Sequence, residues 1–568
     1  MSLGQIETPQ GIKKYLPILG WLPGYPSKWL RQDLVAGLTT AAVVIPQAMA
    51  YATIAGLPVE VGLYTVLILM VVYAILGTSR VLMVSVTSTI SILTAATLAS
   101  VVPEGDSAAY LTAAATLAVL VGVFLILAGL LRLGILANLI SKPVLTGFKA
   151  GVGVVIFVGQ IAKVLGVSID KAPFLQTLVA LIQSLDTIHW VTFGVALVSL
   201  AILIFLPRIR PQIPAALMAV FLGILASALL NLEALGVSIV GDIPSGLPTP
   251  KLPDLSLVSQ LWAGALGIAL MSFIESNAAG RSFLRKGEPP INANQELVAL
   301  GIANIGSSLF QGYAGGGGTS ITAVNRNAGA KTQLTSIIIV ISVILTLLFL
   351  ASVIGLLPQA TLGAMVMVAA AGLISIESFR QIRRIRNTEF IWAVIAFLGV
   401  VLLGTLEGIL IAVLISILTL FIQSSFPPVY ALGRKPGTDV FRPLSTDHPD
   451  DETFPGLLMV RTEGRMNFSS APNATAKFLT MIEGMDLQVI AIDFSAIPDL
   501  EYTALENLEE LDEQLNSQGI QLWLTALNPE PLNIIRRSSL GEVLGNERLF
   551  FNMEQAVEAY QSRREAGE

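Results

Sequence analysis

The sequence predicts a polytopic α-helical membrane protein followed by a soluble α/β domain. Of its 568 residues, 54% are hydrophobic and only 13% are charged, about half the charged fraction of a soluble domain. The mean hydropathy is +0.75, and apolar runs follow one another from about residue 33 to residue 426. Beyond Pro427-Pro428 the composition becomes that of a soluble domain. Helices that cross a bilayer explain such a composition, whereas a water-soluble core does not.

The composition also excludes several kinds of site. The chain has no Cys, which excludes disulfides, thiolate metal sites and Cys nucleophiles. Its two His residues, His189 and His448, are too few for a His-rich metal site. No cofactor motif or catalytic constellation is recognisable, so we expect neither an enzyme nor a nucleic-acid partner. Residues 1–32 are polar, lack the pattern of a cleavable signal peptide and are expected to form a cytoplasmic N-terminal segment.

The transmembrane domain is expected to cover residues 33–428. A helix needs about 17 to 25 apolar residues to cross the hydrocarbon, and fourteen runs approach or reach this length. They lie near residues 34–56, 62–77, 82–100, 109–131, 144–166, 190–206, 213–232, 258–280, 295–311, 316–330, 335–356, 360–376, 389–404 and 406–426.

The distribution of Lys and Arg supports this count. If the N-terminus is cytoplasmic, the predicted inner connections hold most of the basic residues between the runs, and the outer ones hold mainly Asp and Glu. A single missed span would reverse this pattern downstream. We therefore expect a multi-pass protein of the plasma (inner) membrane with both termini in the cytoplasm.

Fourteen spans divide into two sets of seven, and an odd number of spans forces the second set to insert upside down. We expect inverted repeats at about 33–232 and 258–426. The first repeat has Pro46-Gln47 where the second has Glu275, and Thr87-Ser88-Thr89 corresponds in the same way to Thr319-Ser320. Spans interrupted at matching positions indicate a binding site near the membrane midplane.

The third and tenth runs each contain a break followed by hydroxyl residues. A half-helix that starts inside the bilayer offers free N–H groups and the positive end of its dipole to an anion. Gly315 to Gly318 would let the backbone approach that anion, although small residues also serve helix packing. The candidate anion-binding residues are Gln47, Tyr51, Thr87, Ser88, Gly318, Thr319, Ser320 and Thr322.

Glu275 is the candidate ion-coupling residue because it lies in the middle of a predicted span. An acidic residue at the bilayer centre costs about 2.5 to 3.5 kcal/mol on insertion scales. We expect Glu275 to be protonated, bound to a cation such as sodium, or in contact with water; a structural ion pair would need a partner distant in sequence. Lys149, near a cytoplasmic span end, is expected to extend towards the interface, and Glu407 lies at a predicted outer turn.

Several stretches have distinctive sequences, namely IPQAMAYATIAGLP (45–58), VGLYTVLILMVVYAILGTSR (61–80), ISKPVLTGFKAG (140–151), VGDIPSGLP (240–248), ELVALGIANIGSSLFQGY (296–313) and AVNRNAGAKTQ (323–333). They resemble the SulP family of anion transporters, whose animal members are the solute carrier 26 proteins. The resemblance runs through nearly the whole chain. It implies the uracil-transporter-like fold, with core and gate domains, an anion site between the starts of the third and tenth helices, and a homodimer. It also implies an acidic coupling residue at the position of Glu275.

Two positions depart from the pattern of many sulfate-type members. Ile321 stands where those members have Arg, so the tenth segment supplies neither a positive charge nor the basic half of a Glu–Arg proton switch. Ser85-Val86 stands where Gly-Pro is common before the third half-helix. These departures weaken the inference from the sulfate branch that this chain transports sulfate.

The tail at residues 436–568 is expected to be a soluble α/β domain. Its pattern predicts strands at 456–462, 489–494 and 519–526 and helices at 504–517 and 531–538. This pattern resembles a STAS domain, the usual C-terminal partner of the SulP fold. Thr503 takes the place of the phosphorylatable Ser of anti-sigma-factor antagonists, which would make it a regulatory site. A plain helix cap in a dimer scaffold is the alternative.

Together these features predict a secondary active transporter of a small inorganic anion that works by alternating access. Sulfate is the first choice, with proton or sodium coupling through Glu275 and no cofactor beyond that ion. A sodium-dependent bicarbonate transporter, with sodium at Glu275, is the second reading. An uncoupled chloride or anion channel or exchanger would need a continuous wet path and no dependence on Glu275. A nucleobase transporter of the same fold usually lacks a STAS domain.

Overall fold

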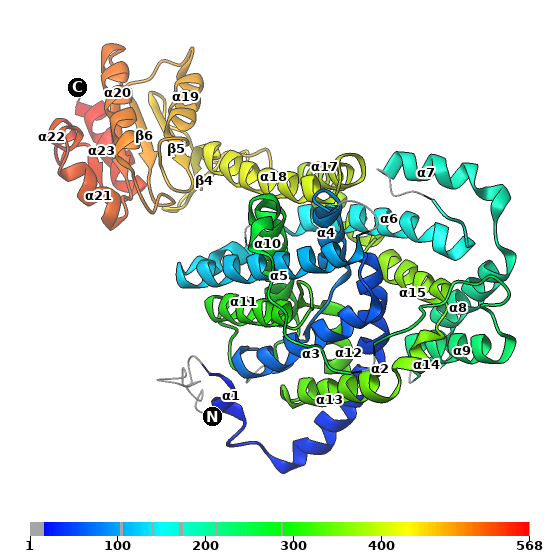
Figure 1. Cartoon of the computed structure of the whole chain (residues 1–568). Coiled ribbons are helices and arrows are strands. Elements are labelled where there is room, and N and C mark those ends of the chain that lie inside the picture. The colour runs from blue at the N-terminus through cyan, green and yellow to red at the C-terminus, as the bar shows by residue number, and fades with distance from the viewer. Residues whose placement is uncertain are drawn as a thin grey trace. The chain divides into compact units, whose positions relative to one another are not determined.

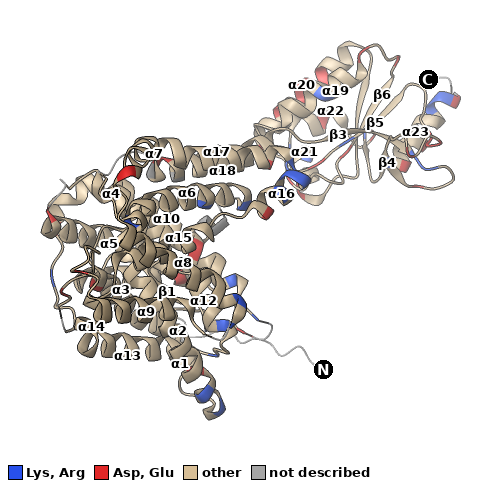
Figure 2. Ribbon diagram, turned by 90° about the vertical axis from the view of Figure 1, so that its right-hand side faces the viewer, with Lys and Arg blue, Asp and Glu red and all other residues tan. Residues whose placement is uncertain are grey.

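A computed structural model describes residues 16–102, 106–138, 141–169, 174–210, 213–244, 246–285 and 288–566. The chain forms two compact units, residues 1–416 and 417–568, which divide within the helix Thr405–Ser425. Each unit is described by itself. Figure 2 shows the helices of the N-terminal unit almost free of charged residues along their length, whereas the C-terminal unit carries both signs of charge.

The N-terminal unit contains two successive sets of helices in a similar order. After the short α1 (Ile18–Trp21), the first set comprises α2 (Ser27–Ile54), α3 (Val59–Leu76), β1 (Val84–Ser85), α4 (Ser88–Ala99), α5 (Ser107–Leu130), α6 (Lys142–Leu165), α7 (Phe174–Gln183), α8 (Trp190–Ile209) and α9 (Ala215–Leu230). The second comprises α10 (Val258–Ser282), α11 (Ala293–Leu309), β2 (Gly316–Gly317), α12 (Thr319–Asn327), α13 (Leu334–Phe349), α14 (Ala351–Gly355), α15 (Gln359–Ala371), α16 (Ile376–Ile385), α17 (Asn387–Leu403) and α18 (Thr405–Ser425).

Every predicted span overlaps one of these helices, and the many apolar helices confirm a multi-pass helical protein. Within the described residues, seven helical segments are both long and apolar enough to cross a bilayer unaided. Other helices are shorter, and two of them, α4 and α12, each follow a two-residue strand. The number fourteen stays a prediction.

The two sets meet at β1 and β2, which pair antiparallel with Val84 opposite Gly317 and Ser85 opposite Gly316. Each strand leads directly into a short helix, α4 or α12. Because the strands run in opposite directions, the chain enters these two helices from opposite sides. This is the arrangement that an inverted repeat requires.

The helices of this unit form two groups. In the core bundle (α2–α5 and α10–α13), α5 packs on α10 and α11, and α13 packs on α2 and α3 (Figure 1). In the gate bundle (α6–α9 and α15–α17), α6 packs on α15 and α17, and α8 packs on α9 and α15. The helix α2 also contacts α9 and α15, so it lies where the two bundles meet.

Glycine brings α5 and α11 close together inside the core bundle. A Cβ added at Gly122 would lie 2.6 Å from the carbonyl oxygen of Gly301, and one added at Gly301 would lie 2.7 Å from the carbonyl oxygen of Gly122. Real Cβ atoms do not approach so closely, so the crossing needs glycine on both helices. Small residues at such crossings are the usual means of close packing between membrane helices.

The C-terminal unit is a six-stranded sheet with helices on both faces (Figure 1). Alternate residues of β6 face opposite sides: Ile490 and Ile492 join one hydrophobic cluster, and Val489 and Ala491 join the other. The strand order is β4-β3-β5-β6-β7-β8, with parallel pairing from β5 to β8. The elements are β3 (Val429–Arg434), β4 (Phe441–Pro443), β5 (Leu457–Thr462), α19 (Ala471–Ile482), β6 (Val489–Asp493), α20 (Tyr502–Ser517), β7 (Gln521–Thr525), α21 (Pro529–Arg536), α22 (Ser539–Leu544), β8 (Leu549–Phe550) and α23 (Met553–Ala566).

The close crossing of α5 and α11 makes a stability prediction. Gly122→Ala should destabilise the protein by about 1 to 3 kcal/mol, because overpacking forces neighbouring backbone apart. Gly159 in α6 has open space where a Cβ would lie, so Gly159→Ala is the matched control and should not lower the unfolding temperature. Thermal unfolding of both purified variants in detergent measures the difference. Equal unfolding temperatures would contradict the tight crossing.

Candidate functional site

The helices α4 and α12 both begin at the paired strands β1 and β2. Thr87 caps α4, since its hydroxyl accepts a hydrogen bond from the Ile90 N–H at 3.3 Å. Gly318 precedes α12 and provides no side-chain cap. Thr87 and Ser88 are buried, whereas the side chains of Thr319 and Ser320 are exposed. Two helix starts with hydroxyl side chains therefore lie at one place, as the sequence predicted.

The glycine run before α12 serves chiefly to bring backbone against α10. A Cβ at Gly316 would lie 2.7 Å from Ser272 Oγ, and one at Gly317 would lie 2.7 Å from the Ser276 Cα. The Ser276 hydroxyl accepts a hydrogen bond from the Gly317 N–H at 2.6 Å. Packing thus accounts for these glycines, the reading that the sequence favoured less. A Cβ added at Gly318, which borders the helix start, would have no neighbour closer than 3.7 Å.

Glu275 contacts both the start of α4 and the gate bundle. Its Oε1 accepts a hydrogen bond from Thr89 Oγ1 at 3.1 Å and lies 3.2 Å from Lys149 Nζ. Its Oε2 accepts a longer bond from Thr87 Oγ1 at 3.5 Å. The carboxylate is buried, whereas the Lys149 side chain is 28% exposed. This ion pair links α10 of the core bundle to α6 of the gate bundle.

Lys149 is the site residue that sequence reasoning missed. We expected it to extend towards the interface, and that expectation is wrong because its ammonium group faces Glu275. Lys149 lies seven residues after Lys142, where α6 begins, which places it about 10 Å along the helix. A lysine at that depth was the available signal. The distant ion-pair partner that we considered for Glu275 therefore exists.

A cavity of about 120 Å³ opens beside these groups, where α2 meets the gate bundle. Tyr51 lines it, and its hydroxyl interacts with Ser88 at the start of α4. The Gln47 Oε1 is buried without a hydrogen-bond partner in the part of the chain that the structure describes. Such an orphaned polar atom needs a ligand or water. The remaining lining residues are Ala50, Leu203, Ala216, Met365, Val368 and Ala369.

Thr322 is buried and does not line this cavity; its side chain forms a hydrogen bond with the backbone instead. Its hydroxyl accepts a hydrogen bond from the Met83 N–H at 3.1 Å, next to β1. Gly318 also donates its N–H to the Met83 carbonyl at 3.0 Å. The structure therefore brings Gln47, Tyr51 and Ser88 together but gives Thr322 a supporting position.

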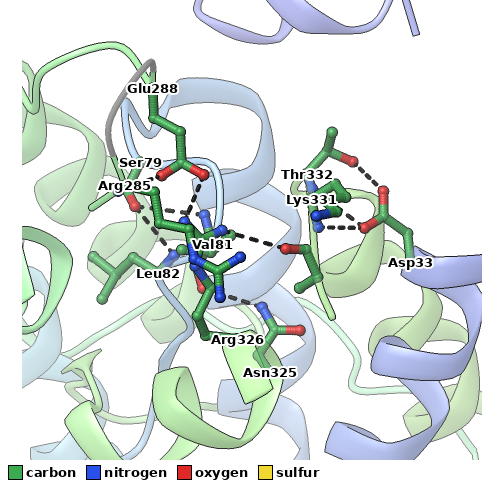
Figure 3. Close-up of polar contacts among 11 residues, drawn as sticks. Asp33, Ser79, Val81, Leu82, Arg285, Glu288, Asn325, Arg326, Lys331 and Thr332 are labelled. Atoms are coloured by element: carbon green, nitrogen blue, oxygen red, sulfur yellow. Dashed lines mark hydrogen bonds and ion pairs between the residues drawn. The ribbon is translucent and has the colours of Figure 1, made fainter. Parts of the chain in front are cut away.

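Side chains from distant segments hold the non-helical stretch that precedes β1. Gln333 Nε2 donates to the carbonyls of Ser79 and Leu82, both at 2.9 Å. Asn325 Nδ2 donates to the Val81 carbonyl at 3.1 Å (Figure 3). Backbone groups at membrane depth must find partners inside the protein, and these two amides provide them.

Two carboxylates hold the C-terminal end of α12 and the loop that follows it. Asp33, in the second turn of α2, accepts hydrogen bonds from the Lys331 N–H at 2.7 Å and the Thr332 hydroxyl at 2.7 Å (Figure 3). Glu288 pairs with the buried Arg326 at 2.6 Å, at the end of α12. The half-helix α12 is therefore held at its far end as well as at its start.

Comparison with known proteins identifies the family. The model of the sulfate permease family matches residues 30–396, and the STAS domain model matches residues 448–557. The chain belongs to the sulfate permease family.

Curated relatives of this sulfate permease family protein match it over almost its full length. A "probable sulfate transporter" of Mycobacterium tuberculosis is 36% identical and covers 96% of this chain and 99% of its own. The "high affinity sulfate transporter 1" of Stylosanthes hamata is 30% identical and covers 97% of this chain and 86% of its own. These relatives are named as transporters and not as enzymes.

Solved structures share the fold. The murine solute carrier 26 family member A9 anion transporter, in an inward-facing state, superposes with a TM-score of 0.90 at 23% identity, covering 98% of this chain and 96% of its own. The transmembrane domain of the cyanobacterial bicarbonate transporter BicA superposes with a TM-score of 0.58 at 26% identity, covering 69% of this chain and 97% of its own. The predicted architecture, a multi-pass helical domain followed by a STAS domain, is confirmed.

Thr503 lies in this STAS domain, in the first turn of α20. Its side chain is exposed, and the helix is preceded by Glu501, which makes no side-chain cap. Thr503 is therefore not the N-cap of α20, and its hydroxyl is accessible. Regulation through Thr503 stays a prediction.

The contrast between Thr322 and Thr319 can be tested in α12. Thr322→Val should destabilise the protein by about 1 to 3 kcal/mol, because it leaves the buried Met83 N–H without a partner. Thr319→Val, at an exposed position of the same helix, should leave stability nearly unchanged. Thermal unfolding of the two purified variants checks this expectation. A larger loss for Thr319→Val would show that the supporting role is misassigned.

Proposed function

We propose that this protein is a secondary active transporter that moves an inorganic anion by alternating access with proton coupling. Sulfate is the first choice of anion. The observation that carries the proposal is the Glu275–Lys149 ion pair beside the start of α4. Full-length relatives named as sulfate transporters support the choice of anion. The proposal places the protein in the plasma (inner) membrane as a homodimer with cytoplasmic termini.

The anion would bind where the two half-helices begin. The starts of α4 and α12 offer backbone N–H groups and the positive ends of two helix dipoles. Ser88, Thr319 and Ser320 add hydroxyl donors, and Tyr51 adds another from α2. The cavity between α2 and the gate bundle gives the anion a route to these groups. No cofactor is needed for this chemistry.

Lys149 would supply the positive charge that Ile321 cannot. While Glu275 is ionised, its carboxylate balances the ammonium group at 3.2 Å. When Glu275 takes up a proton, the charge of Lys149 is no longer compensated and the site attracts an anion more strongly. The proton and the anion therefore favour each other's binding, as symport requires.

The same ion pair would link binding to movement. Glu275 belongs to the core bundle and Lys149 to the gate bundle, so the pair bridges the two bodies that move in alternating access. Protonation weakens this bridge. The core bundle can then carry the bound anion past the gate bundle.

A sodium-dependent bicarbonate transporter is the second candidate. The fold shared with the BicA transmembrane domain favours it. Sodium at Glu275 would have to share the carboxylate with Lys149, and two cations at one carboxylate repel each other. The ion pair therefore favours a proton over sodium as the coupling ion. An uncoupled anion channel or exchanger would leave this ion pair without a role in transport.

Substitutions at the ion pair test the coupling. Glu275→Gln should keep downhill sulfate exchange but lose acceleration by an inward proton gradient, because the amide cannot titrate. Lys149→Gln should raise KM for sulfate roughly tenfold or more, since losing a bond to a charged group costs about 1.5 to 3 kcal/mol. Uptake of labelled sulfate into proteoliposomes measures both effects. Thr503→Ala is the control and should transport normally. Unchanged proton-driven uptake by Glu275→Gln would remove Glu275 from coupling.

A further inference from the structure

The helix α16 (Ile376–Ile385) is a short amphipathic helix between α15 and α17. Its ten residues span about 15 Å, too little to cross the hydrocarbon. Phe379, Ile382 and Ile385 follow a three-residue spacing that places them on one side of the helix. Ile385 is 78% exposed, so part of this apolar side is left uncovered by the protein. Such a helix between two spans is expected to lie along the membrane surface with its apolar side in the lipid.

The polar side of α16 carries three Arg and one exposed acidic residue, Glu377, which accepts a hydrogen bond from Gln381. Arg380, Arg383 and Arg384 follow the spacing that places residues on one side of a helix, and all three are exposed. Arg380 and Arg384 make no ion pair within the described residues, and Arg383 lies over the Phe390 ring at 5.7 Å. Arg386, just past the helix, pairs with Glu389. Three guanidinium groups are therefore available to an external anion.

The first set of helices contains a natural comparison. The helix α7 (Phe174–Gln183) also has ten residues and lies between α6 and α8, as α16 lies between α15 and α17. It exposes apolar side chains such as Leu175 and Ile182 but contains no charged residue. An inverted repeat places the two helices at opposite membrane surfaces. The positive charge thus occurs only on the helix that the basic-residue pattern assigns to the cytoplasmic side.

We propose that α16 binds anionic phospholipid headgroups of the cytoplasmic leaflet through Arg380, Arg383 and Arg384. That leaflet carries negatively charged lipids, and guanidinium groups bind phosphate with two parallel hydrogen bonds. Ile385, which lies on the other side of the helix from these arginines, enters the adjoining acyl region. Because α16 packs on α6 and α17, the bound lipids hold the gate bundle at the membrane surface. The proposal is independent of which anion is transported.

The test measures lipid preference with the full-length protein. Protein reconstituted in nanodiscs of equal phosphatidylcholine and phosphatidylglycerol is extracted gently, and the retained lipids are counted by mass spectrometry. The wild type should retain phosphatidylglycerol preferentially. The triple variant Arg380→Gln, Arg383→Gln, Arg384→Gln should lose this preference roughly tenfold or more, because each basic residue near the surface contributes separately. High salt should weaken the wild-type preference.

Two controls separate lipid binding from other effects. Arg536→Gln, Arg537→Gln, Arg564→Gln removes the same charge from exposed positions of the C-terminal unit and should retain the preference. Replacing the three α16 arginines by Lys keeps the charge and should retain most of it. An unchanged preference in the α16 Gln variant, or an equal loss in the C-terminal control, would overturn the proposal. The proposal would also be overturned if the α16 Gln variant lost binding of an acidic protein while its retained phosphatidylglycerol stayed unchanged.

Discussion

The constraint on which the N-terminal unit depends is that backbone without helical hydrogen bonds must find partners inside the protein at membrane depth. The strands β1 and β2 satisfy part of it by pairing with each other. Ser272 and Ser276 of α10 bond the glycine run, and Gln333 and Asn325 bond the stretch before β1. These contacts let two helices start in the middle of the protein and direct their N–H groups to a common site.

The ion pair of Glu275 and Lys149 adds to this scaffold a carboxylate that we propose a proton can neutralise. A buried charge is costly unless it is paired, and here the partner comes from the other bundle. In the proposed mechanism, a change in the charge of Glu275 changes both the field at the proposed anion site and the contact between the bundles. With Ile at position 321, the proposed mechanism takes its positive charge from Lys149 of α6.

Local sequence features predicted the parts of the site that local structure determines. The hydroxyl residues after each break predicted the starts of α4 and α12. The mid-span position of Glu275 singled it out as a functional candidate, and the structure buries it beside the start of α4. The position of Lys149 about two turns into α6 could have indicated an unusual lysine, but no local pattern identifies its partner Glu275 on a distant helix. Thr322 was given to the anion because its hydrogen-bond partner, the Met83 N–H, also lies far away in sequence.

The fold shows the same division between local and distant information. The long apolar runs and the central strands β5, β6 and β7 were predictable from their hydrophobic patterns. The helices α7 and α16 were missed, because ten amphipathic residues between two spans resemble a connecting loop. The strands β4 and β8, at the two edges of the sheet, were also missed because they are short and only partly buried.

The measurement that tests the central claim most directly is uptake of labelled sulfate and labelled bicarbonate into proteoliposomes under imposed proton or sodium gradients. Proton coupling through Glu275 and Lys149 predicts that an inward proton gradient drives sulfate uptake without sodium. Sodium-driven bicarbonate uptake, with no response of sulfate to the proton gradient, would contradict the account.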